Sequence, residues 1–294
     1  MSEGRPLPAF AFYERFVMRL LFAWLVFQAT PKGLIVRGIP SPNGFARLVD
    51  LHFLLDPRAF VFCQRLLIIA LVLYVLRLIV WLALPVALFV NVATNAITNS
   101  QGGIQHAMQI VSLVLLAQTA AHFYGLWRRH RGEERALLEN RAIWWSQQTI
   151  VAVYLVAGIT KMMVTKGRWI FDARWLGVSI AKSAYQSFYD THNQVELHHQ
   201  LAIAHFAATH GWLMLLVAAA GLFLELGSPL MLVNRVWALS LGCALICFHI
   251  GLTYSMQLSF IYNQWLLFIF MVNAPYWVVF VGRKIFRARD ATSP

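Results

Sequence analysis

The sequence predicts an all-α polytopic membrane protein, a bundle of about eight transmembrane helices. Of its 294 residues, 60% are hydrophobic and only 12% are charged, and the mean hydropathy is +0.63. Soluble proteins are roughly half apolar and a quarter charged, so too few charged residues remain here to cover a water-exposed surface. The aromatic content of 14%, with 11 tryptophans, is typical of the aromatic belts at membrane interfaces.

Eight apolar stretches have spanning length, since a transmembrane helix needs about 20 apolar residues. The first is Tyr13 to Thr30. We expect it to be a retained helix, because no small-residue cleavage site of a signal peptide follows it. The block from Phe60 to Ala96 is too long for one helix, and Arg77 divides it into two short spans joined by a tight turn. The remaining spans are Ile104–Trp127, Ala142–Met163, Gly211–Val233, Val236–Gln257 and Ile261–Val281.

The basic loops predict the orientation through the positive-inside rule. Residues 128–141 and 282–289, with Arg235, fall on one side of an eight-span protein. We expect that side, and both termini, to be cytoplasmic, in an inner membrane. Either this orientation is inverted or the cations on the opposite side have a purpose: Lys161, Lys166, Arg168, Arg174 and Lys182. The net charge of +12 does not indicate a nucleic-acid partner, since the cations lie between apolar runs.

We interpret residues 1–294 as one transmembrane domain with an extracytoplasmic loop at 164–210. The loop mixes aromatic and charged residues, which predicts short amphipathic helices in the membrane interface. Glu196 and His199 have the Glu-x-x-His spacing of carboxylate-bridged metal sites. Such sites need further carboxylates, and the whole chain has 12 acidic residues. We therefore expect a solvated loop and no metal. A metal-dependent membrane oxidase is kept as an alternative to the two interpretations given below.

Lys161 is a cation that appears before an apolar run has ended, in YLVAGITKMMV. One interpretation is a surface anchor whose ammonium group reaches the interface. The other follows from the spacing: Gln147, Tyr154 and Lys161 are seven residues apart, nearly two helical turns, and form one polar stripe. Gly158 lies close to this stripe and leaves room for a neighbour or a ligand. An inward-facing stripe predicts that Gln147, Tyr154 and Gly158 bind a ligand and that a partly desolvated Lys161 acts as a base.

Other polar residues lie inside the predicted spans, where a charge costs roughly 2.5–3.5 kcal/mol at the bilayer centre. Glu225 is the only acid of its span, and we expect it to fix the bundle by pairing with Lys, Arg or His. His106 opens the fourth span, and His249 and Gln257 lie in the seventh. A lone histidine in a span is often a packing residue. In this topology, however, His106, Lys161 and Gln257 lie toward the same leaflet, which favours a shared site that also includes His249.

Several segments, in order, resemble the transmembrane part of the vitamin K-dependent gamma-carboxylases, over about Tyr13 to Trp277. The pattern Ala157, Gly158, Lys161 with a following Trp169 is similar to the segment around the family's catalytic base. The other similar segments are YVLR ending at Arg77, QHAMQIVSLVLLAQ with His106, LFLELGSPLMLV with Glu225, and CFHIGLTYSMQLSFIYN with Phe248 and His249. The broader group is the horizontally transferred transmembrane (HTTM) domain proteins.

The resemblance implies quinone chemistry. The carboxylases oxygenate reduced vitamin K, and the strong base formed removes a glutamate γ-proton before carbon dioxide adds. By this likeness Lys161 would be the catalytic base that deprotonates a hydroquinone, and His106 would help to form the reaction site. A quinone-like lipid would occupy an apolar cavity with Lys161 at its polar end. The carboxylases also carry a soluble domain after the membrane part, and a second lysine where this chain has Thr160. We therefore do not expect protein carboxylation by this chain alone.

Two interpretations of different kinds remain open beside the metal-dependent oxidase named above. In the first, the chain binds membrane lipid of the quinone type and acts as a carboxylase-like oxidoreductase or lyase. In the second, it is a non-catalytic membrane subunit or maturation factor in a larger complex, and its polar residues fix the bundle and an interface with a protein partner.

Overall fold

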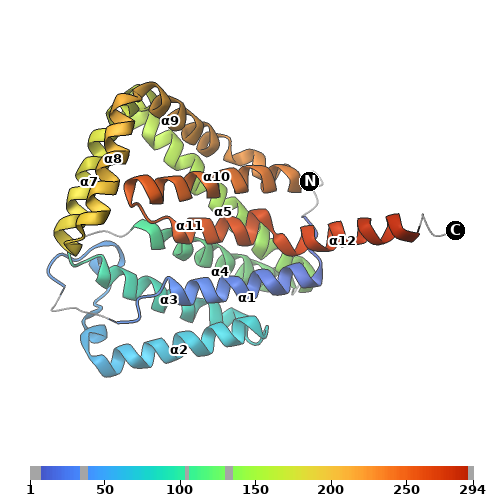
Figure 1. Cartoon of the computed structure of the whole chain (residues 1–294). Helices are drawn as coiled ribbons and strands as arrows, with labels where there is room; N and C mark the ends of the chain where they lie inside the picture. Colours follow the sequence, from blue (N-terminus) through green and yellow to red (C-terminus); the bar gives the residue numbers. More distant parts are fainter. Residues whose placement is uncertain (1–7, 34–38, 103–105, 130–134, 291–294) are drawn as a thin grey trace. The chain divides into compact units, whose positions relative to one another are not determined.

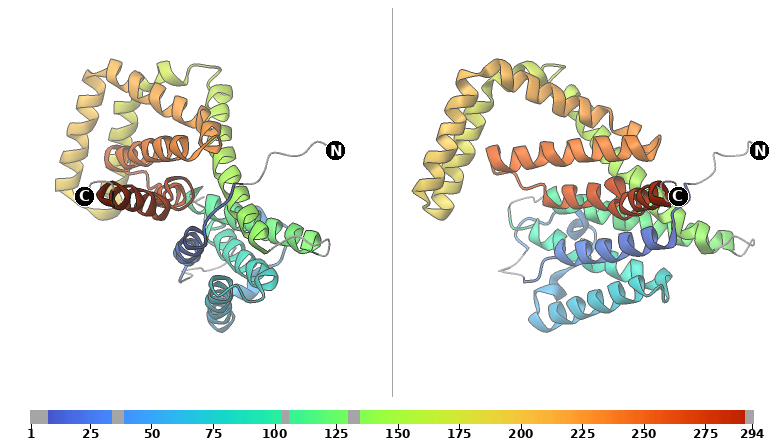
Figure 2. Two further views of the ribbon diagram at one scale, coloured as in Figure 1. Left: turned by 90° about the vertical axis from the view of Figure 1, so that its right-hand side faces the viewer. Right: turned by 45° about the vertical axis from the view of Figure 1, so that its right-hand side comes forward.

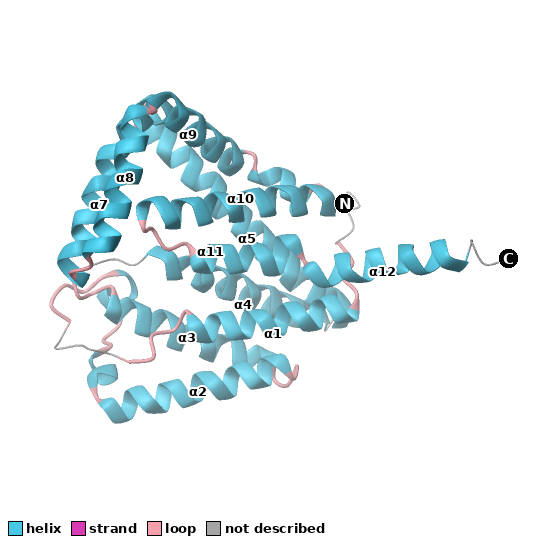
Figure 3. Cartoon of the chain, viewed as in Figure 1, coloured by secondary structure: helices cyan, strands magenta, loops and turns pink. Residues whose placement is uncertain are grey.

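The computed structural model describes residues 8–33, 39–102, 106–129 and 135–290, and in these ranges the secondary structure is helical without a strand (Figure 1, Figure 3). The chain forms two compact units. The first comprises the residues up to Ile150 and those from Phe268 onward, and the second comprises Val151–Leu267. Helix α5, Arg135–Val164, contributes its first half to the first unit and its second half to the second.

The first unit contains the helices α1 to α4, the first half of α5, helix α12 and several short helical turns. The long helices are α1 (Phe12–Gln28), α2 (Pro57–Val75), α3 (Val80–Thr98) and α4 (Gln109–Arg129). The 3-10 turns η1 (Gly44–Arg47), η2 (His52–Leu55) and η3 (His106–Met108) precede α2 or α4, and the π-helical turn η6 (Phe268–Val272) leads into α12 (Ala274–Asp290). Helix α3 packs between α2 and α4, and α1 contacts both α2 and α4. The core of the unit includes Phe22, Leu67, Leu84 and Leu115.

The second unit contains a helical hairpin and three further helices around the end of α5. The short α6 (Trp169–Asp172) and η4 (Ala173–Trp175) lead into α7 (Leu176–Thr191), which packs along α8 (Gln194–Thr209), as both views of Figure 2 show. Asn193 caps α8 by accepting a hydrogen bond from the Glu196 amide at 3.1 Å. The remaining elements are α9 (Gly211–Leu226), η5 (Ser228–Leu232), α10 (Arg235–Met256) and α11 (Ile261–Leu267).

The predicted division of the long apolar block at Arg77 is confirmed. Helix α2 ends at Val75 and α3 begins at Val80. In the turn between them Arg77 has φ 63° and Ile79 has φ 38°, left-handed values that side chains other than glycine rarely adopt. Asp56 and Pro57 fix the other end of α2, because the Asp56 side chain accepts a hydrogen bond from the Arg58 amide and proline suits the first helical position.

The predicted count of eight spans is not confirmed. Six helices of the described residues are long and apolar enough to cross a membrane, or seven if the bent pair α8–α9 is one span. The expected first span corresponds to α1, which has 17 residues and carries Glu14, Arg15 and Arg19. Within the expected sixth span, the regular α-helix ends at Leu226, and Pro229 lies in the 3-10 turn that follows. The chain is therefore a multi-pass membrane protein, with α1 and α8–α9 as the elements that decide the number of crossings.

Candidate functional site

Lys161 and Glu225 form an ion pair in the second unit. The Lys161 ammonium group, near the end of α5, contacts Oε1 of Glu225, near the end of α9. The Glu225 side chain is 6% exposed, whereas that of Lys161 is 29% exposed. The ammonium group also lies 5.2 Å from the ring centroid of Trp169, within the range of a cation–π interaction. We expected Glu225 to pair with a basic residue, and in this structure that residue is Lys161.

Tyr154 and His249 form a second polar pair in the same unit. The Tyr154 hydroxyl and Nε2 of His249 are 2.8 Å apart, and both side chains are buried. The His249 ring stacks on Phe260, with centroids 4.6 Å apart. This pair connects α5 and α10, while the pair of Lys161 connects α5 and α9.

Gly158 allows α5 and α9 to approach closely. A Cβ atom at this position would lie 2.9 Å from Leu226 and 3.3 Å from Glu225, which is closer than side-chain carbons normally pack. Of the two uses that the sequence leaves open for Gly158, the structure shows contact with a neighbouring helix. The Ser228 hydroxyl adds a buried hydrogen bond of 3.2 Å to the carbonyl group of Val151.

Two buried polar atoms of this cluster have no hydrogen-bond partner among the described residues: Oε2 of Glu225 and Nδ1 of His249. Buried polar atoms are nearly always paired, because an unpaired one costs roughly 1–3 kcal/mol. While the Glu225 carboxylate is ionised, its oxygen can act only as a hydrogen-bond acceptor. Nδ1 accepts or donates according to which ring nitrogen carries the proton. These two atoms are the positions at which the cluster is chemically incomplete.

The remaining predicted site residues have other surroundings. Gln147 belongs to the first unit, where its amide group donates to the carbonyl oxygen of Phe270 at 2.7 Å. Gln257 ends α10 in a left-handed conformation and donates to Glu196 at 3.1 Å. His106 begins η3 in the first unit, and its side chain lies outside the described residues. The structure thus brings together Lys161, Tyr154, Gly158, Glu225 and His249 within the second unit. The site roles of Gln147, Gln257 and His106 stay predictions.

The histidine-rich segment forms hydrogen bonds on the surface. Nε2 of His199 and the hydroxyl of Tyr254 are 2.9 Å apart, and Glu196 accepts hydrogen bonds from Gln200 and Gln257, each at 3.1 Å. Across the described part of the chain, no group of three or more His, Cys, Asp or Glu side chains is placed to hold a metal ion. The predicted absence of a metal stays a prediction.

The sequence interpretation missed one partner in the second unit and one group in the first. Phe260 stacks on the His249 ring, and an aromatic residue between the seventh and eighth predicted spans was the available signal. In the first unit, Glu139 is buried among arginines. Its signal was an acid followed almost at once by the apolar run of α5.

Three cavities are lined by residues of the first unit alone. The largest, about 680 Å³, lies between η1, α3 and α4 and is mostly apolar, with Phe45, Phe89 and Leu113 in its wall. A second, of about 410 Å³, lies between α1 and α2. The third, of about 270 Å³, contains the arginines around Glu139. None of these three is lined by Lys161, so the cavity that the resemblance implies at this lysine stays a prediction.

Comparison with known proteins gives no relative: no family model, no curated protein and no solved structure matches the chain.

Proposed function

We propose that this chain binds a lipid-soluble, quinone-like molecule and performs acid–base chemistry on it with the Lys161–Glu225 pair. The observation that carries the proposal is that a buried carboxylate is held by a lysine through one oxygen while its other oxygen has no partner among the described residues. The resemblance to HTTM-type proteins and the gamma-carboxylases supports the same assignment. An inner-membrane location with both termini in the cytoplasm belongs to the proposal, on the strength of the basic loops.

The two unpaired atoms suit the polar groups of a quinol. Oε2 of Glu225 would accept a hydrogen bond from a hydroxyl group, and Nδ1 of His249 offers a second polar contact. A bound quinol supplies an acidic O–H group and two electrons. The proton would pass to Oε2 of Glu225 while Lys161 stays protonated, or to Nζ of Lys161 after this lysine has released its own proton. The lysine would then keep a positive charge beside the site, where it stabilises an oxyanion.

Tyr154 would position the histidine rather than transfer the proton. Its hydroxyl fixes Nε2 of His249 at 2.8 Å, and Phe260 fixes the plane of the ring. The protonation of Nε2 determines whether Nδ1 donates or accepts a hydrogen bond. The hydrogen bond of Tyr154 to Nε2 therefore controls whether a ligand would meet a donor or an acceptor at Nδ1. No metal is required for these roles.

The second candidate is a non-catalytic membrane subunit or maturation factor with a protein partner. The observation that favours it is that each polar pair joins different helices, Lys161 to Glu225 and Tyr154 to His249. Such pairs fix the arrangement of a bundle whether or not any chemistry follows. The two candidates differ in what accompanies the purified protein, a quinone or a polypeptide.

The first experiment is solvent extraction of the full-length protein purified in mild detergent, followed by chromatography and mass spectrometry. We expect a quinone or quinol in near-equimolar amount. Binding of an added short-chain naphthoquinone then provides a titratable measurement. Tyr154→Phe should weaken this binding by about the value of one hydrogen bond, roughly 0.5–1.5 kcal/mol. The matched control is Tyr254→Phe, which removes an exposed Tyr–His hydrogen bond of 2.9 Å and should leave binding unchanged.

Lys161 is tested by two substitutions with different expected results. Lys161→Arg retains a cation for Glu225 but cannot release its proton, so we expect retained quinone and lost quinol-dependent oxygen consumption. Lys161→Met should lose both, while Lys182→Met, at an exposed position of α7, should lose neither. Absence of extracted quinone together with unchanged naphthoquinone binding in Lys161→Met would refute the proposal. A stoichiometric co-purifying polypeptide in that case would establish the second candidate.

A further inference from the structure

The largest cavity of the first unit has an apolar body and a polar end. Its volume of about 680 Å³ falls within the usual range of ligand pockets, roughly 300–1,000 Å³. The wall follows α3 from Pro85 to its end and α4 from Gln109 to Leu116. The polar residues of the wall lie before η1, at the end of α3 and at the start of α4: Asn43, Asn95, Asn99, Gln109 and Ser112. The apolar residues continue from there along both helices.

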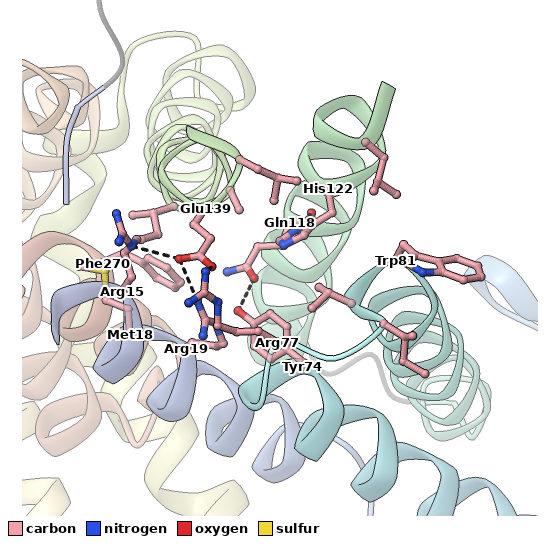
Figure 4. A pocket seen from close by; sticks show the side chains of 16 residues that line it. Arg15, Met18, Arg19, Tyr74, Arg77, Trp81, Gln118, His122, Glu139 and Phe270 are labelled. Carbon is pink, nitrogen blue, oxygen red and sulfur yellow. Dashed lines mark hydrogen bonds and ion pairs between the residues drawn. The ribbon is translucent and has the colours of Figure 1, made fainter. Parts of the chain in front are cut away.

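The wall of this cavity carries no charge. Of the described residues that line it, none is Asp, Glu, Lys, Arg or His. The cavity of about 270 Å³ in the same unit has the opposite chemistry, since Figure 4 shows Arg15, Arg19 and Arg77 around Glu139 in its wall. A charged ligand would lose water in the large cavity without gaining a counter-charge, which is strongly unfavourable. The large cavity therefore favours an uncharged ligand.

Asn95 presents an acceptor atom at the polar end. This residue is only 8% exposed, and its Nδ2 donates to the carbonyl oxygen of Ala29 at 3.2 Å and to that of Asn91 at 2.9 Å. These two carbonyl groups assign the amide orientation, because an oxygen in the place of Nδ2 could not donate to them. Oδ1 of Asn95 accepts no hydrogen bond from the residues that the structure describes, and Asn95 lines the cavity. Because buried amide oxygens are nearly always paired, this atom favours a ligand that donates a hydrogen bond.

Ser112 supplies a second acceptor from the facing helix. Its hydroxyl group donates to Oδ1 of Asn91 at 2.7 Å, and Nδ2 of Asn91 donates to the hydroxyl group of Thr30 at 2.8 Å. The hydrogen of the Ser112 hydroxyl group is thus already used, and toward a ligand its oxygen acts as an acceptor. Asn91 is bonded to both Ser112 and Asn95, so one residue holds the two acceptors near each other.

The apolar body of the cavity opens on the outer faces of two candidate spans. Phe89 of α3 and Leu113 and Leu116 of α4 line the cavity and are exposed. Both helices are long and apolar enough to cross a membrane. Phe45 of η1 meets the Phe89 ring edge-on, with centroids 6.3 Å apart, so aromatic rings border the apolar part. A ligand can therefore reach this part from the hydrocarbon region of a bilayer, which suits the acyl chain of a lipid.

We propose that this cavity binds a monoacylglycerol, an uncharged lipid with one acyl chain and two neighbouring hydroxyl groups. The hydroxyl groups donate to Oδ1 of Asn95 and Oγ of Ser112, and the acyl chain follows the apolar wall of α3 and α4. The proposal does not depend on the Lys161–Glu225 pair, because the wall consists of residues of the first unit.

The two acceptors discriminate against other lipids. A quinone or a fatty ester has only acceptor atoms, and a fatty acid or phospholipid brings a charge. A diacylglycerol has a single hydroxyl group for two acceptors. A quinol has two, but they lie on opposite sides of a ring, which does not suit two acceptors held by one residue.

The test is competition binding to the full-length protein in dodecylphosphocholine, a detergent whose headgroup has no hydroxyl group. Tritiated 1-monomyristoylglycerol is the probe, and a scintillation proximity assay measures the label bound to the protein. We expect saturable binding. Unlabelled 1-monomyristoylglycerol should compete at least about tenfold better than methyl myristate, which has the same acyl chain without a hydroxyl group. Dimyristoylglycerol should lie between them, and a short-chain naphthoquinol is the fourth competitor.

Variants test the hydroxyl contacts and the acyl chain separately. Ser112→Ala and Asn95→Leu should each reduce the preference for monomyristoylglycerol over methyl myristate by about threefold or more, the effect of one hydrogen bond, and leave methyl myristate binding unchanged. Leu113→Trp fills the apolar part from an exposed position and should weaken both ligands by about tenfold or more. The matched control is Ile69→Trp, at an exposed position of α2 outside the cavity wall, which should bind as the native protein does.

Equal competition by monomyristoylglycerol and methyl myristate would overturn the proposal, and so would binding that does not saturate. A naphthoquinol that competes more strongly than monomyristoylglycerol would show that the cavity takes a quinol and that the acylglycerol is wrong. Native preference in Ser112→Ala together with native affinity in Leu113→Trp would place the binding elsewhere and overturn the proposal as well. The comparison of ligands on the native protein needs no variant, so it gives a result even if Asn95→Leu does not fold.

Discussion

Removal of Lys161 should destabilise the protein more than neutralisation of Glu225, because the two partners differ in access to water. Lys161→Met leaves the Glu225 carboxylate without its ion-pair partner, and that side chain is only 6% exposed. Glu225→Gln leaves an ammonium group on a side chain that is 29% exposed. The long, flexible side chain of Lys161 can extend toward water, whereas the shorter side chain of Glu225, buried between packed helices, cannot.

The expected magnitudes follow from this asymmetry. Loss of one partner of a buried ion pair costs roughly 3–5 kcal/mol, and the partial exposure of Lys161 places Lys161→Met at the lower end, near 3 kcal/mol. Glu225→Gln keeps the shape and one acceptor oxygen, so we expect about 1–2 kcal/mol, the cost of a weakened hydrogen bond. The double variant Lys161→Met/Glu225→Gln should cost less than the two singles added together, with a coupling of about 1 kcal/mol or more.

The assay is reversible unfolding in mixed micelles of dodecyl maltoside and sodium dodecyl sulfate, followed by helical circular dichroism. The native protein, both single variants and the double variant form one thermodynamic cycle. Lys182→Met is the control for a lysine without this burial and should change the free energy of unfolding by less than about 0.5 kcal/mol. Additive single effects, within about 0.3 kcal/mol, would show that the pair contributes no coupling. A larger cost for Glu225→Gln than for Lys161→Met would show that the argument from exposure is wrong.

Two further predictions concern crossings and helix packing. Reporter fusions after Asn99 and after Pro294 should report opposite sides of the membrane. This result requires an odd number of crossings between the two positions, and the number is odd only if the bent pair α8–α9 crosses the membrane. Reporters on the same side would exclude that crossing. Gly221→Ala should destabilise by about 1–3 kcal/mol, because its Cβ would overlap the Phe248 ring between α9 and α10, whereas Gly251→Ala, with no atom within 4 Å of a new Cβ, should be neutral or slightly stabilising. Equal unfolding temperatures for the two alanine variants would contradict the packing of α9 against α10.

The sequence was most informative where one helix alone determines the answer. Apolar length and the position of Arg77 predicted the break between α2 and α3, and the seven-residue spacing placed Tyr154 and Lys161 along one helix. The partner of each polar residue depends instead on which helix lies opposite, and periodicity carries no information on that. Glu225 was expected to have a basic partner, but 64 residues separate it from Lys161. The functional roles of these residues stay predictions.

Gln147 shows why equal spacing did not give equal surroundings. It continues the spacing of Tyr154 and Lys161, yet its amide group donates to the Phe270 carbonyl in a π-helical turn. Such a turn breaks the regular helical hydrogen-bond ladder and leaves backbone groups that need other partners. No pattern of hydrophobic residues predicts a π turn, so nothing in the sequence indicated this acceptor, and the assignment of Gln147 to a ligand site stays a prediction.

Arg77 shows a second limit of reading charges from sequence. The positive-inside rule counts an arginine in a short turn as a topology signal and treats it as interchangeable with lysine. In the structure the same arginine is directed by a left-handed turn to Glu139, beside two arginines from α1. The geometry of a planar guanidinium group matters for that contact, and a lysine would satisfy the topology rule without reproducing it. An arginine that the sequence presents only as a topology signal can therefore also make a specific contact with a buried carboxylate.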